Sequence, residues 1–151
     1  MLKIILINRH VIASIVWVGS VFMGTFIDWP AAKASKREGV FPFEFIVGQG
    51  SRVFYSVYTG IALLWISGIG LIVAAPPEGV LDIAMITIKV TCLSLMTGFT
   101  LYGTLSTWPK LQLATHEEAF THYKYYMYRA VGTFTFGIIA SVAGLWLRHL
   151  G

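Results

Sequence analysis

Residues 7–20 read INRHVIASIVWVGS and open the first long apolar run of the chain, which continues to Ile27. A run of this length is typical of a helix that crosses a membrane, because about 20 predominantly apolar residues span the hydrocarbon core. His10 lies inside the run, and an ionisable side chain at membrane depth is costly enough to indicate a functional site. The opening stretch therefore predicts a membrane fold and a candidate residue within it.

The composition of the whole chain predicts an integral membrane protein. Its 151 residues are 56% hydrophobic and 12% charged, and its mean hydropathy is +0.73, values outside the range of ordinary soluble domains. Four apolar stretches, at about residues 4–27, 53–75, 82–107 and 125–147, are each long enough to span a bilayer. We expect one all-α transmembrane domain, residues 1–151, folded as an up-down-up-down four-helix bundle.

The distribution of basic residues predicts an orientation. The net charge of +4 does not form the basic stripe of a nucleic-acid-binding protein, because the basic residues are divided between the two membrane faces. With four spans both termini lie on one face, here called side A, and the opposite face is side B. Cytoplasmic loops are enriched in Lys and Arg. We therefore expect side B in the cytoplasm of a bacterial-type inner membrane and both termini outside, since side B carries most of the basic residues: Lys33, Lys36, Arg37, Arg52, Lys110, Lys124 and Arg129.

A seven-residue pattern occurs twice, at the same place in two helices that run in the same direction. Residues 24–30 read GTFIDWP and residues 103–109 read GTLSTWP, 79 positions further along the chain. The match indicates an internal duplication into two helical hairpins, residues 1–75 and 80–151, related by a pseudo-two-fold axis along the membrane normal. We expect Pro30, and Pro109 by the same pattern, to end its helix.

The duplication gives His10 a counterpart. The same offset leads from His10 to Lys89, and both residues lie about six or seven positions into their spans, roughly 10 Å below side A. A lysine at that depth costs about 2.5–3.5 kcal/mol unless it is paired or hydrated, although its long side chain could also reach back to side A. We expect His10 and Lys89 at one level on either side of the pseudo-two-fold axis.

Two interpretations of His10 stay open. A neutral histidine could simply bond to a neighbouring hydroxyl, such as that of Ser14. Alternatively, neutral imidazole is a common axial ligand of haem iron and a good ligand for copper. Trp17, two turns deeper, would then form the apolar floor of a haem slot, or else only pack the bundle. Haem propionates could pair with basic residues at the side A rim: Lys3, Arg9 and Arg148.

The other histidines are weaker candidates. His149, at the end of the fourth span, could join His10 as a second axial ligand, but it lies about six residues, roughly 9 Å, nearer the surface. His116 and His122 are on side B, where we expect solvated loop residues rather than a metal site. On the same side, Asp28 could cap the loop or pair with Arg52.

Short motifs at matching places in the spans carry a resemblance to a known superfamily: Arg9-His10, Trp17-Val18-Gly19, Arg52, Ser67-Gly68-Ile69-Gly70 and Lys89. The chain resembles the four-helix membrane unit shared by the copper-resistance protein D family, the HemJ-type membrane protoporphyrinogen oxidase and the membrane region of bacterial membrane-bound urate hydroxylases. In HemJ-type enzymes a histidine early in the first helix and a lysine early in the third are linked to haem b binding and activity, and they match His10 and Lys89. The resemblance implies haem b as cofactor, adds Arg52 to the candidate cofactor-binding residues, and makes a HemJ-type oxidoreductase activity a hypothesis without transferring a substrate.

Three functional hypotheses follow. The first is a haem b-binding membrane redox protein that exchanges electrons with a quinone or porphyrin-like partner. The second is transport of copper or a small solute along the axis, using His10, Lys89 and Cys92. The third is a non-catalytic subunit of a larger respiratory complex. In each case we expect surrounding membrane lipid and a homo-oligomer or larger membrane complex, and no nucleic acid.

Overall fold

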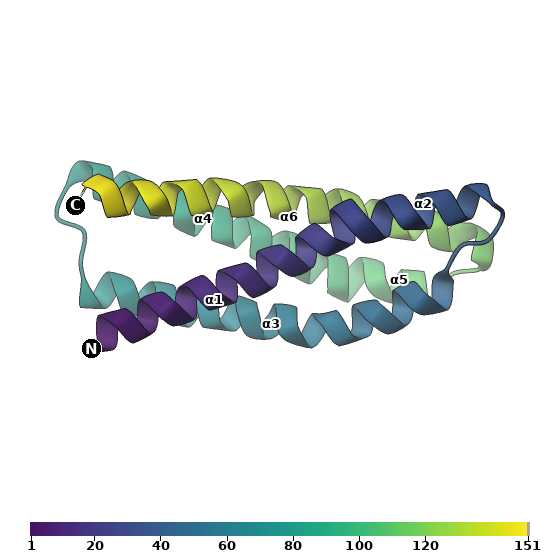
Figure 1. Cartoon of the computed structure of the whole chain (residues 1–151), viewed down its shortest axis with the longest axis horizontal. Coiled ribbons are helices and arrows are strands. Elements are labelled where there is room, and N and C mark those ends of the chain that lie inside the picture. The colour runs from purple at the N-terminus through teal and green to yellow at the C-terminus, as the bar shows by residue number, and fades with distance from the viewer. Residues whose placement is uncertain (151) are drawn as a thin grey trace.

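The computed structural model describes the backbone of residues 1–150 and the side chains of all of these except 116 and 147–150. Within this range the chain is all helical, and four long apolar helices can each cross a membrane: Leu2–Arg37, Phe43–Ala74, Val80–Gln112 and Glu117–Trp146. The protein is therefore a multi-pass membrane protein with a four-helix bundle fold, as the composition and the apolar stretches predict. Both termini lie at the same end of the bundle (Figure 1).

The first and third spans are each built from three consecutive helical segments. The first consists of α1 (Leu2–Met23), the π-helix η1 (Gly24–Asp28) and α2 (Trp29–Arg37). The third consists of α4 (Val80–Tyr102), η2 (Gly103–Thr107) and α5 (Trp108–Gln112). The second and fourth are the unbroken helices α3 (Phe43–Ala74) and α6 (His116–Leu150).

Large apolar side chains cover the outside of the bundle, as a bilayer requires. Ile12, Ile66 and Leu105 are each more than 60% exposed although they lie within the spans. The interior is instead packed where small residues let helices approach closely. A Cβ at Gly60 of α3 would lie 3.4 Å from the Cβ of Trp17, and one at Gly137 of α6 would lie 3.1 Å from Val18. Gly60 and Gly137 therefore lie at contacts between helices.

Each hairpin packs first against itself, because α1 contacts mainly α3 and α4 contacts mainly α6. The first span also crosses the bundle diagonally: it begins beside α3 at side A, and η1 contacts α6 further along (Figure 1). The crossing brings Trp29 of α2 into a stack with Phe120 of α6, with ring centroids 5.4 Å apart. The Trp108 ring of α5 contacts Phe54 of α3 and Tyr126 of α6. Aromatic contacts therefore link all four spans at side B.

The expectation that Pro30 and Pro109 end their helices is wrong, because the chain continues as a helix to Arg37 and to Gln112. In each case a π-helical turn comes immediately before the proline. The N–H of Trp29 bonds to the carbonyl of Gly24, and the N–H of Trp108 bonds to that of Gly103, both five residues back. Proline has no N–H and its ring clashes with the carbonyl four residues back in a regular helix. The wider π turn moves that carbonyl away, so the helix passes the proline.

The helices also extend beyond the apolar stretches at side B. The aromatic residues after Pro42 form the first turns of α3. His116 and His122, expected as solvated loop residues, instead belong to α6. Glu118 accepts bonds from the backbone N–H of Thr115 at 3.3 Å and from its hydroxyl at 2.9 Å. This capping box begins the helix.

Candidate functional site

His10 lies half-buried on α1, where it faces α3. Its Nδ1 lies 2.8 Å from the hydroxyl oxygen of Ser67. The Ser67 hydroxyl in turn donates to the backbone carbonyl of Leu63, at 2.5 Å. A hydroxyl has one hydrogen to donate, so Ser67 accepts from His10, and Nδ1 carries the imidazole proton. The network therefore leaves the lone pair of a neutral His10 on Nε2.

The hydrogen bond on Nδ1 of His10 resembles the one that metal-binding histidines make with their other ring nitrogen. Histidines that bind a metal usually donate their other ring N–H to a carbonyl, carboxylate or water, which fixes the tautomer and the orientation of the ring. Here Ser67 fills that role. The ring packs against the neighbouring Gly68, where a Cβ would lie 3.5 Å from Cε1 of His10, an ordinary van der Waals distance. The hydroxyl of Ser14, expected as an alternative partner, instead donates to the backbone carbonyl of His10 at 2.9 Å.

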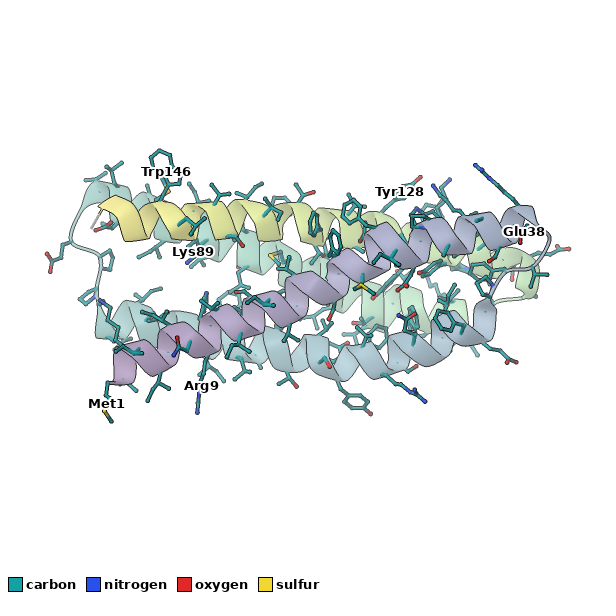
Figure 2. The ribbon with its side chains drawn as sticks, in the orientation of Figure 1. Met1, Arg9, Glu38, Lys89, Tyr128 and Trp146 are labelled. Atoms are coloured by element: carbon teal, nitrogen blue, oxygen red, sulfur yellow. The ribbon has the colours of Figure 1, made fainter. Side chains whose placement is uncertain are left out.

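Lys89 lies half-buried on α4, in the second hairpin, where it faces α6 of the same hairpin. A Cβ at Gly144 of α6 would lie 3.1 Å from the Nζ of Lys89. The lysine side chain therefore packs against a glycine, as His10 packs against Gly68. In Figure 2 the Lys89 side chain lies on the inner side of the α4–α6 pair. Among the described residues it has no hydrogen-bond or ion-pair partner.

The other residues predicted for the site lie elsewhere or are not described. Arg9 is exposed and points away from the bundle (Figure 2). Arg52 is exposed on the side B half of α3. Trp17 is fully buried and packs against Gly60, two turns deeper than His10. His149 falls outside the described side chains. The structure thus places His10 against α3 and Lys89 against α6, and it places Arg9 and Arg52 away from both.

Two polar contacts were not expected from the sequence. Ser67 appears in the sequence only as a small packing residue 57 positions from His10, and no local pattern joins them. Asp28 accepts a bond from Gln49 at 3.2 Å, whereas Arg52, its expected partner, is exposed. The only sequence feature that accompanies the first contact is that Ser67 stands next to Gly68.

The ligands available near His10 limit which metal centres are compatible with this site. No three His, Cys, Asp or Glu side chains gather into a metal-binding group in the part of the chain that the structure describes. A porphyrin supplies four nitrogens itself, so its iron needs only one or two protein ligands. The single free Nε2 of His10 suits that chemistry.

Comparisons with known proteins give no relative: no family model, no curated protein and no solved structure matches the chain.

Proposed function

We propose that the protein is a haem b-binding integral membrane redox protein, with Nε2 of His10 as an axial ligand of the iron. The observation that carries the proposal is the chain of hydrogen bonds from His10 through Ser67 to the Leu63 carbonyl. It gives the imidazole one tautomer and one orientation before any ligand binds, which is the usual contribution of the residue behind a metal-binding histidine. The motif resemblance to the HemJ-type and copper-resistance protein D superfamily supports the same cofactor.

Lys89 complements this role from the other hairpin. Its ammonium group is half-buried and has no partner among the described residues, so it is available to a carboxylate such as a haem propionate. A buried charge without a partner is costly, and binding an anionic group would remove that cost. Haem b, when bound, would supply a one-electron iron centre. The chain itself would supply the ligand, the positive charge and surroundings of low polarity.

An absorbance spectrum of the purified protein, expressed with ample haem, tests this proposal. We expect a haem b Soret band in the wild type, its loss in His10→Ala and its retention in His122→Ala, which changes a histidine on the side B half of α6. A colourless wild-type protein, or an unchanged band in His10→Ala, would contradict the proposal.

A further inference from the structure

A cavity of about 240 Å³ lies between the helices of both hairpins, in the side B half of the bundle. It is bordered by η1 on the first span, by α3, by the end of the third span and by α6. Along α1, Gly24 at its edge is roughly 20 Å from His10. The cavity is therefore separate from the His10 and Lys89 site.

Five aromatic side chains line the cavity together with aliphatic and polar residues. The Trp108 ring lies 4.8 Å from Phe54 and 5.2 Å from Tyr126, centroid to centroid, and all three rings line the space with Phe99 and Tyr123. Gly50 is needed here, because the Trp108 ring occupies the place that a Cβ at position 50 would take. Flat apolar walls of this kind suit a planar ring, which can stack on them.

Two of the residues that line the cavity, Trp108 and Arg129, carry N–H donors. Trp108 is only 4% exposed, and its indole N–H has no hydrogen-bond partner among the described residues. A buried donor without a partner costs free energy that an acceptor on a ligand would recover. Arg129 lines the same space; its guanidinium donates to Thr107 and lies 4.4 Å from the Tyr102 ring centroid. Because a guanidinium has five N–H groups, further donors remain for a ligand.

One wall of the cavity reaches the lipid-facing surface. Met23 lines the cavity and is also 45% exposed on the outside of the bundle. The outside at this depth is covered by apolar side chains such as Phe26 and Ile27. A ligand that enters past Met23 would therefore come from the bilayer rather than from water.

We propose that this cavity binds the ring of a membrane quinone. A quinone ring is planar, carries carbonyl oxygens that accept hydrogen bonds, and is dissolved in the bilayer by its apolar tail. The cavity is smaller than the roughly 300–1,000 Å³ of a pocket for a drug-sized ligand, so it holds a single ring, with the tail leaving past Met23. The choice of a quinone rests on the proposed redox function, for which it would be the electron-exchange partner.

Calorimetric titration of the purified protein in detergent tests the site with two matched probes. Duroquinone carries two carbonyl oxygens on a methylated ring, and durene is the corresponding methylated benzene. We expect saturable binding of duroquinone at one site per chain and binding of durene at least tenfold weaker. Trp108→Phe keeps the aromatic wall but removes the N–H, and should weaken duroquinone binding about threefold to tenfold. Arg129→Gln should weaken it tenfold or more, because a bond to a charged donor is stronger.

The controls separate this proposal from the haem proposal. Trp146→Phe repeats the Trp108 substitution, and Lys124→Gln likewise replaces a cation by an amide, both at exposed positions of α6, and both should bind duroquinone as the wild type does. His10→Ala should also bind it normally, even if haem is lost. Since Arg129 also bonds to Thr107, Trp108→Phe carries the test if Arg129→Gln does not fold. Equal binding of duroquinone and durene, or unchanged affinity in Trp108→Phe, would overturn the quinone site and leave the haem proposal intact.

Discussion

The hydroxyl of Ser67 has one hydrogen, and the carbonyl of Leu63 takes it. The consequence reaches His10, whose Nδ1 must then donate and whose Nε2 is left with the lone pair. Gly68 and Gly144 are in contact with the two ionisable side chains, Gly68 with His10 and Gly144 with Lys89. The tautomer of His10 therefore depends on Ser67 of α3 as well as on α1.

Removing the Ser67 hydroxyl tests this dependence. In Ser67→Ala the His10 ring loses its fixed tautomer and orientation, and we expect haem affinity to fall about tenfold to a hundredfold, measured by absorbance titration. Ser141→Ala is a matched control, since that hydroxyl also donates to a carbonyl four residues back, at 2.8 Å, but supports no histidine. Equal affinity in Ser67→Ala and Ser141→Ala would show that Ser67 does not position His10.

The sequence placed His10 and Lys89 within apolar spans, because the apolar flanking residues and the repeat offset can both be read from it; their common level across the pseudo-two-fold axis stays a prediction. It did not predict that Ser67 would be the partner of His10. That contact joins residues 57 positions apart and depends on the rotation of α3 about its axis, which local patterns leave open. From the sequence, Ser14 was the nearer hydroxyl, one turn away on the same helix. Its bond to the His10 backbone carbonyl is the ordinary choice of a serine within a helix.

The two π-helices distinguish the first and third spans from the second and fourth, which are unbroken α-helices. They occupy the first five positions of the two seven-residue repeats and end immediately before the Trp-Pro pair of each. The repeat was visible in the sequence, but its conformation was not: proline suggested two helix ends, whereas the π turn carries the helix past each of them. The duplication of the hairpins stays a prediction, and the equal conformation of the two seven-residue repeats is what it would lead one to expect.

Shortening a π turn tests why it is there. Deleting Ile27, which is 48% exposed, would convert η1 to a regular turn and return a carbonyl to the ring of Pro30. We expect a loss of about 3 kcal/mol of stability, measured by unfolding in detergent. Combining the deletion with Pro30→Ala should recover most of that loss. A deletion variant as stable as the wild type, or one that Pro30→Ala does not rescue, would contradict this explanation.

At the scale of the whole molecule, the two ends of the bundle differ in charge and in packing. Cations of side B lie over aromatic rings: the Nζ of Lys33 is 5.0 Å from the Trp29 centroid, and that of Lys36 is 4.6 Å from Phe120. Aromatic residues and cations together are typical of a membrane interface. The four spans and their up-and-down order could be predicted from hydropathy alone. The diagonal crossing of the first span, and the cavity that it borders, depend on packing between hairpins and could not.

The excess of cations on side B predicts the orientation in the membrane. In a Cys92→Ser background, we expect a membrane-impermeant maleimide to label Glu78→Cys, in the side A turn, in intact cells. Lys36→Cys, on side B, should be labelled only after the cells are opened. The reverse pattern would place the termini in the cytoplasm and contradict the charge argument.

The account depends most on the claim that Nε2 of His10 binds haem iron, and chemical rescue tests it most directly. His10→Gly removes the imidazole and leaves a space, so added imidazole can take its place. We predict that His10→Gly gives no haem b Soret band without imidazole, and that the band returns as imidazole is titrated. A Soret band of wild-type intensity in His10→Gly without imidazole would contradict the account.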